Sequence, residues 1–190
     1  MLEEKKWWDK IGLSVIVSFI EEINHFPGLT LCDAVPVYYE RSMDYYKDVL
    51  SKMGHLGLKR ALFTTQAPIE ANYSEQQIYN KMKESFKILS EYAGQRQLKI
   101  LLTNTRFRIA ADVKQQKQML QQIGVSANMG LAVNLNHLSE QEYSQSIDDA
   151  GHLLDVVILG GVGSMEHSEY LPIAESGKSA DKLNRLKDVL

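Results

Sequence analysis

Short runs of apolar residues, many of them β-branched, recur along the chain and alternate with segments that have helical spacing. Continuous apolar character over so few residues is typical of a parallel strand that is covered on both faces. The sequence therefore predicts five buried strands. They cover residues 12–19, 60–65, 98–103, 129–135 and 154–159.

The segments between these runs carry apolar side chains three or four positions apart, which is the spacing of an amphipathic helix. Two stripes stand out: Met43, Tyr46, Leu50 and Met53, and then Ile78, Met82, Phe86, Leu89 and Ala93. Ser74 with Gln77, and Ser139 with Glu142, have the capping-box spacing that marks the start of a helix. Further helices are predicted over residues 112–123, 140–152 and 179–190.

Strict alternation of strand and helix predicts right-handed βαβ units, a parallel sheet and the α/β fold class. A doubly wound sheet normally carries a glycine-rich turn after its first strand, but residues 20–23 contain no glycine. A TIM barrel gathers polar residues at the carboxyl ends of its strands. The predicted strands end in such residues, namely Thr64-Thr65, Thr103-Asn104-Thr105, Asn134-Leu135-Asn136-His137 and Gly160-Gly161. The pattern favours the barrel.

The charge balance gives no sign of a nucleic-acid or membrane partner, because 21 basic residues are scattered among 24 acidic ones. The apolar run over residues 11–20 is flanked by acids and is shorter than the roughly 20 residues that span a bilayer. The one cysteine, Cys32, cannot form an internal disulfide. These observations predict a cytoplasmic protein.

Four segments resemble motifs of one known family. Residues 56–63 resemble its Leu-Gly joint between helix and strand, and residues 128–138 resemble a strand that ends in Asp or Asn with a His three residues later. Residues 156–161 resemble the next strand, and residues 170–186 resemble the closing Pro, Gly and amphipathic helix. Together they resemble the sugar phosphate isomerase/epimerase family of xylose isomerase-like TIM barrels, over roughly residues 42–190.

The resemblance implies an incomplete barrel, in which residues 12–19 form the third strand and strands one, two and eight are missing. A typical TIM barrel has about 250 residues, and residues 1–190 are predicted to form one such partial domain. Truncation of the gene product is the favoured explanation, and replacement of the missing parts by a dimer contact or by the N-terminal stretch is the alternative. Unpaired edges and an exposed inner face lined by Val15, Leu62, Ile100 or their neighbours predict a homo-oligomer.

The resemblance also implies a divalent metal, Mn, Mg or Zn, held by carboxylates and a histidine. Thr103, Asn134 and Val157 stand where relatives commonly have metal-binding groups, which leaves His137 as the metal candidate. Hard cations require several oxygen ligands, so an impaired metal site and no cofactor are predicted. The alternative for His137 is a rim histidine that bonds Asn134 or a backbone carbonyl.

The predicted substrate contacts all lie at strand ends, and no catalytic residue is assigned. They are Thr65, Asn104, Asn134, Asn136, His137, Gly160 and Gly161. The glycines form either a phosphate-binding loop or a tight turn. Three functions remain open: an isomerase or epimerase of a small sugar or sugar phosphate, a non-catalytic carbohydrate-binding or interaction module, and an inactive truncated product.

Overall fold

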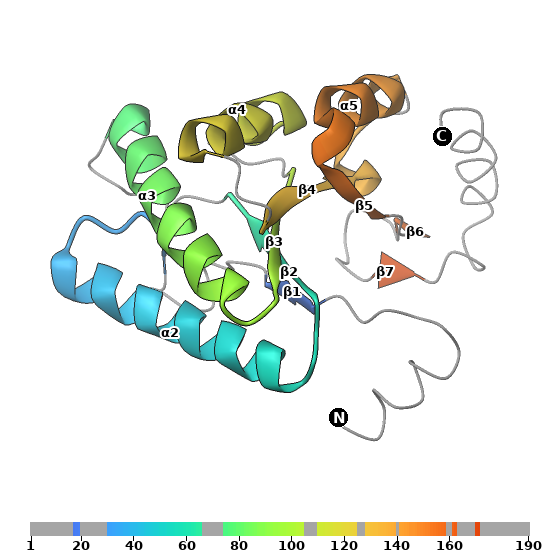
Figure 1. Cartoon of the computed structure of the whole chain (residues 1–190). Helices are drawn as coiled ribbons and strands as arrows, with labels where there is room; N and C mark the ends of the chain where they lie inside the picture. The colour runs from blue at the N-terminus through green and yellow to red at the C-terminus, as the bar shows by residue number, and fades with distance from the viewer. Residues whose placement is uncertain are drawn as a thin grey trace.

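The chain forms a five-stranded parallel sheet whose strand order equals the chain order, with helices along one face (Figure 1). The computed structural model describes residues 17–19, 30–65, 74–104, 110–124, 128–139, 141–158, 161–162 and 170–171. The strands are β1 (Val17–Phe19), β2 (Arg60–Thr64), β3 (Lys99–Thr103), β4 (Met129–Asn134) and β5 (Leu154–Ile158). The helices are α2 (Pro36–His55), α3 (Glu75–Gly94), α4 (Val113–Ile123) and α5 (Glu142–Ala150), with 3-10 turns η1 (Leu135–His137) and η2 (Gly151–Leu153).

The predicted α/β architecture is confirmed. Strands β2 to β5 run parallel and in order, Asn134 ends β4, and His137 follows directly in η1. The short strands β6 (Gly161–Val162) and β7 (Tyr170–Leu171) form a separate antiparallel pair. Residues 12–16 of the first predicted strand and the predicted helix at 179–190 lie outside the described residues. No helix in the described ranges combines the length and apolarity of a membrane span.

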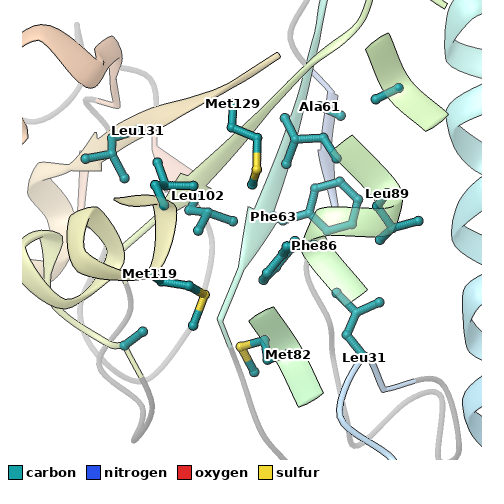
Figure 2. Packing of buried hydrophobic residues seen from close by; sticks show 14 of the residues in the cluster. Leu31, Ala61, Phe63, Met82, Phe86, Leu89, Leu102, Met119, Met129 and Leu131 are labelled. Carbon is teal, nitrogen blue, oxygen red and sulfur yellow. The ribbon is translucent and has the colours of Figure 1, made fainter. Parts of the chain in front are cut away.

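The main core lies between the sheet and the helices. Both predicted helical stripes are buried there in full. Figure 2 shows Phe63 of β2 packing beside Phe86 of α3, with Met82 and Leu89 on the same helix. Alternate residues of the strands supply the other half of this layer, namely Ala61, Phe63, Ile100, Leu102, Leu131 and Val133.

The opposite, inner face of the sheet carries the predicted Leu62 and a neighbour of Ile100, but it differs from the prediction in its exposure. Leu62 pairs with Leu101 in the β2–β3 register, so Ile100 faces the helices and its neighbour Leu101 takes the inner position. The inner cluster of Leu62, Leu101 and Ala132 is buried rather than exposed. Side chains alternate strictly between the faces of a strand, and the sequence alone did not fix which residue of each run points inward. Val15 lies outside the described residues.

The two predicted capping boxes are not equivalent. At the start of α3, Ser74 accepts a hydrogen bond from the Gln77 amide, and the Gln77 side chain accepts one from the Ser74 amide. At Ser139, both the amide and the hydroxyl donate to the Glu142 carboxylate, which lowers the pKa of Glu142. Helix α5 then begins at Glu142 and ends at Ala150. The described helix is therefore shorter than the predicted range of 140–152, whose last residues form η2.

We expect Ser74→Ala to lower the free energy of unfolding by about 1 kcal/mol, because it removes the acceptor for a free amide of the first helical turn. Ser139→Ala should change the stability far less, as is usual for a surface substitution, since it removes a donor to the exposed Glu142 carboxylate. Urea denaturation of the two variants in parallel measures both losses. Equal losses would contradict the difference between the two helix starts.

Candidate functional site

The carboxyl ends of β3 and β4 are joined by the side chain of Asn104. Its Nδ2 donates to the Asn134 carbonyl at 3.0 Å, and its Oδ1 accepts from the Asn134 amide at 2.6 Å. The side chain is almost fully buried. It therefore extends the ladder between the two strands by one pair of hydrogen bonds beyond their paired residues. This clasp fixes the backbone of Asn134, the last residue of β4.

His137 is held against the same clasp. Its Nδ1 lies 3.0 Å from the backbone carbonyl of Asn104. A carbonyl oxygen can only accept, so Nδ1 carries the proton in this hydrogen bond, and in this tautomer of the imidazole Nε2 keeps a lone pair. The predicted bond from His137 to a backbone carbonyl is thus present, and the ring is half-buried. Asn104, Asn134 and His137 are brought together at one edge of the sheet.

Thr65 lies apart from that group. Its Oγ1 donates to the Ala110 carbonyl at 2.8 Å and accepts from Gln116 Nε2 at 3.4 Å. Gln116 also donates to the Thr103 carbonyl at 2.7 Å, so this fully buried amide of α4 ties the ends of β2 and β3 to the helix layer. Both polar functions of the Thr65 hydroxyl are thus already engaged inside the protein.

The threonines at the last positions of β2 and β3 behave differently. Thr64 and Thr103 are 8% and 3% exposed, and neither hydroxyl has a hydrogen-bond partner among the residues that the structure describes. The two residues are paired in the β2–β3 register. Each follows an inward-facing leucine, Leu62 or Leu101, by two positions, so both hydroxyls belong to the inner face. A buried unpaired hydroxyl costs roughly 1–3 kcal/mol, which makes this pair a costly feature of the fold.

The charged groups of the inner face gather at the opposite ends of the strands. Asp155 of β5 accepts hydrogen bonds from Arg60, the first residue of β2, and from Lys99, the first residue of β3, whose Nζ lies 2.6 Å from Asp155 Oδ2. Lys99 reaches Asp155 across β4, where Gly130 offers no side chain. A Cβ at Gly130 would lie 3.0 Å from Lys99 Cε and 3.1 Å from the Leu153 carbonyl oxygen. We call these three charged residues the basal ion cluster.

The donor set that the described residues form at the carboxyl ends does not fit a divalent metal. It consists of neutral groups: the hydroxyls of Thr64 and Thr103, the amide of Asn134 and the ring of His137. Mg²⁺ and Mn²⁺ prefer carboxylate oxygens and need several of them. Within the described ranges, no three His, Cys, Asp or Glu side chains lie close enough together to hold a metal ion.

The remaining predicted contacts have less structural support. Asn136 lies within η1, between Asn134 and His137. Gly161 belongs to β6 and pairs with Leu171 of β7, so it is part of an antiparallel ladder. Gly160 lies outside the described residues.

The inward positions of three polar residues were not predicted from the sequence, although each had a usable signal. Gln116 lies on the buried stripe of α4 with Val113, Met119 and Leu120, and the helical period would have placed it inward. Thr64 and Thr103 follow Leu62 and Leu101 by two positions, and the strand period would have placed them on the inner face.

Parallel strands in chain order, helices on one face and polar strand ends define a (β/α) barrel, of which the chain forms a part. No protein-family model matches the sequence, and no curated protein matches it. Solved structures do match in fold: D-psicose 3-epimerase (TM-score 0.71, 13% identity) and L-ribulose 3-epimerase (TM-score 0.71, 14% identity) each cover 96% of this chain. The 3-keto-D-glucoside 4-epimerase YcjR from E. coli also covers 96%, with a TM-score of 0.65 and 14% identity.

The match covers only part of each solved structure. The chain spans 65%, 63% and 73% of those three structures, in the order given above. A xylose isomerase domain protein from Planctomyces limnophilus matches less well, with a TM-score of 0.55 and 9% identity. At these identities the similarity establishes the fold, which is that of part of a xylose isomerase-like TIM barrel.

Proposed function

We propose that this chain is a sugar isomerase/epimerase-like protein that binds a small sugar or sugar phosphate at the carboxyl ends of its strands, with an impaired metal site. The observation that carries the proposal is the clasp of Asn104 and Asn134 with His137 beside it. The clasp holds Asn134 and His137 at the edge where TIM barrels bind their ligands. Support also comes from the matched folds, one of which was solved with D-fructose and another with D-allulose.

The chemistry of the groups favours recognition over turnover. Sugar hydroxyls both donate and accept, and the Nε2 lone pair of His137 is suited to accept from one of them. Moving a proton between adjacent carbons of a sugar additionally requires a base and a means of stabilising the developing oxyanion. Among the described residues this donor set contains no carboxylate and only one metal-binding side chain, His137, so binding without epimerisation is the expected behaviour.

Isothermal titration with D-fructose, D-psicose, D-tagatose and Mn²⁺ tests the proposal. We expect a sugar response that His137→Ala weakens about tenfold, the loss of roughly one hydrogen bond. His152→Ala is the matched control, because His152 is an exposed histidine of η2. Mn²⁺ should bind no more tightly than about the millimolar range, and NMR should detect no exchange of carbon-bound protons in D₂O.

Two outcomes would contradict the proposal. A stoichiometric Mn²⁺ site of micromolar affinity that disappears in His137→Ala would restore a metal-dependent isomerase. A sugar response that is equal in the His137 and His152 variants would remove His137 from the site. The roles of Thr65, Asn136, Gly160 and Gly161, the self-association of the chain, and the reading of residues 1–190 as a single barrel domain stay predictions.

A further inference from the structure

The basal ion cluster holds more positive than negative charge. Arg60 and Lys99 share the single carboxylate of Asp155, so two cations less one anion leave a net charge of +1. Among the residues that the structure describes, no other acidic side chain forms an ion pair with either cation. One cation would be enough to neutralise Asp155. The second therefore leaves a positive charge that the described part of the chain does not balance.

Hydrogen-bond donors of the cluster are left over as well. Arg60 donates to Asp155 through Nε, and the two terminal nitrogens of its guanidinium have no partner among the described residues. Lys99 spends one of its three ammonium protons on Asp155 Oδ2. The side chains of Arg60 and Lys99 are 35% and 34% exposed, so a ligand from solution can reach both.

A bulge in β5 turns the carboxylate toward the two cations. Leu154 pairs with Leu131 and Val156 pairs with Ala132, which leaves Asp155 as an extra residue between the two pairs. A bulge redirects a side chain, and bulges are common next to functional sites. Here Val156 packs against the inner cluster while Asp155, directly before it, bonds the cations of the same face.

The sheet curls around the cluster. Strands β3 and β4 lie between β2 and β5, so a flat sheet would hold Arg60 and Asp155 at least about 14 Å apart. Their direct hydrogen bond therefore requires a concave inner face at this level. Gly130 leaves the room in which Lys99 crosses β4. Two cations at the bottom of a concave surface attract anions more strongly than isolated surface charges do.

We propose that the basal ion cluster is a binding site for one further carboxylate, at the opposite end of the strands from the proposed sugar site and independent of it. A guanidinium binds a carboxylate through two parallel hydrogen bonds, and the two terminal nitrogens of Arg60 are available for them. Lys99 adds a compact positive charge with unused donors. A single carboxylate brings the net charge of the cluster to zero, whereas a phosphate dianion would leave the cluster negative.

The carboxylate has two possible sources, which offer the same chemical group. One source is a free carboxylate ion in solution. The other is an acidic side chain of a second copy of this chain, which would reach the cluster when two copies associate. The experiment below uses acetate as the probe and distinguishes the two sources.

Isothermal titration of the full chain with acetate, at neutral pH and at an ionic strength held constant with chloride, tests the site. We expect saturable binding that Arg60→Gln and Lys99→Gln each weaken about tenfold, because each removes the surplus charge and a donor. Asp155→Asn raises the net charge from +1 to +2 and should tighten acetate binding about tenfold. A cluster that serves only the fold would not gain affinity for acetate in this variant.

Lys52→Gln is the matched control. It removes a cation that pairs with Asp48 on the exposed side of α2, so it changes the net charge of the protein as much as Lys99→Gln does. It should leave acetate binding unchanged. Circular dichroism checks that each variant folds, and the two glutamine variants of the cluster decide the test if Asp155→Asn does not fold.

Sedimentation velocity separates the two sources. Acetate binding at an unchanged molecular mass supports a free carboxylate ion, whereas self-association that both acetate and Arg60→Gln suppress supports a side chain of a second copy. The proposal is overturned if acetate changes neither binding heat nor association, or if the Arg60 and Lys99 variants respond to acetate like the unaltered protein. Sugar titrations of the same variants should be unchanged, so failure of sugar binding bears on the proposed function alone.

Discussion

Replacement of Phe86 by alanine is expected to lower the free energy of unfolding by about 3–5 kcal/mol, the usual cost of emptying a fully buried aromatic site. Phe86 has no exposed surface and meets Phe63 edge to face, with ring centroids 5.8 Å apart. Phe63 in turn contacts Tyr46 of α2 at 5.6 Å. The three rings connect α2, β2 and α3, so the cavity would open at the junction of three elements.

Chemical denaturation followed by circular dichroism measures this loss. Val37→Ala is the control, because Val37 is 62% exposed on α2 and should change the stability by less than about 0.5 kcal/mol. Phe86→Leu, which refills much of the volume, should recover a large part of the difference. A loss below about 1 kcal/mol for Phe86→Ala would mean that α3 does not pack on β2 as described.

Replacement of Asp155 by alanine is expected to cost about 2–3 kcal/mol, because it removes the carboxylate that pairs Arg60 and Lys99 in the basal ion cluster. Breaking a fully buried ion pair costs about 3–5 kcal/mol. Asp155 is 12% exposed, but its two partners are 35% and 34% exposed, so solvent screens part of that cost. Asp48→Ala, which breaks the exposed pair with Lys52, should leave the stability nearly unchanged.

The same carboxylate makes stability depend on pH. Burial by itself would raise the pKa of Asp155, but hydrogen bonds from Lys99 and Arg60, together with their charges, hold that pKa below its usual value of 3.8. A lowered pKa in the folded state stabilises the protein above the usual value, and this contribution is lost as the pH falls through the folded pKa. The stability difference between the unaltered protein and Asp155→Asn should therefore shrink below pH 3.8, and a constant difference would contradict the cluster.

The elements could be predicted from the sequence because each depends on local spacing. The stripe from Ile78 to Ala93 repeats with the helical period, and Asn134 and His137 follow a strand whose end is marked by the change to polar residues. Which polar residue faces inward depends on the strand register, because a shift of one position exchanges the two faces of the strand. Thr64 and Thr65 are adjacent and chemically identical, and only the register with β3 decides which hydroxyl faces inward.

Long-range contacts could not be predicted in the same way. Arg60 and Asp155 are 95 positions apart, and nothing in either neighbourhood marks the other as a partner. The difference between Ser74 and Ser139 has a similar origin, because identical spacing leads to two hydrogen-bond patterns once the following residues take different conformations. Local chemistry predicts which groups are available, and the packing of distant strands decides how they are used.

The partners of the basal ion cluster are added to the chain at different times during synthesis. Each strand of the sheet pairs with the strand before it in the chain, so a growing chain can add one βα unit at a time. Arg60 and Lys99 sit near the start of this process, yet their carboxylate partner arrives with β5. Until then both cations remain at the amino ends of their strands without Asp155. A nascent chain therefore has to keep these two cations hydrated until β5 supplies the carboxylate that pairs them.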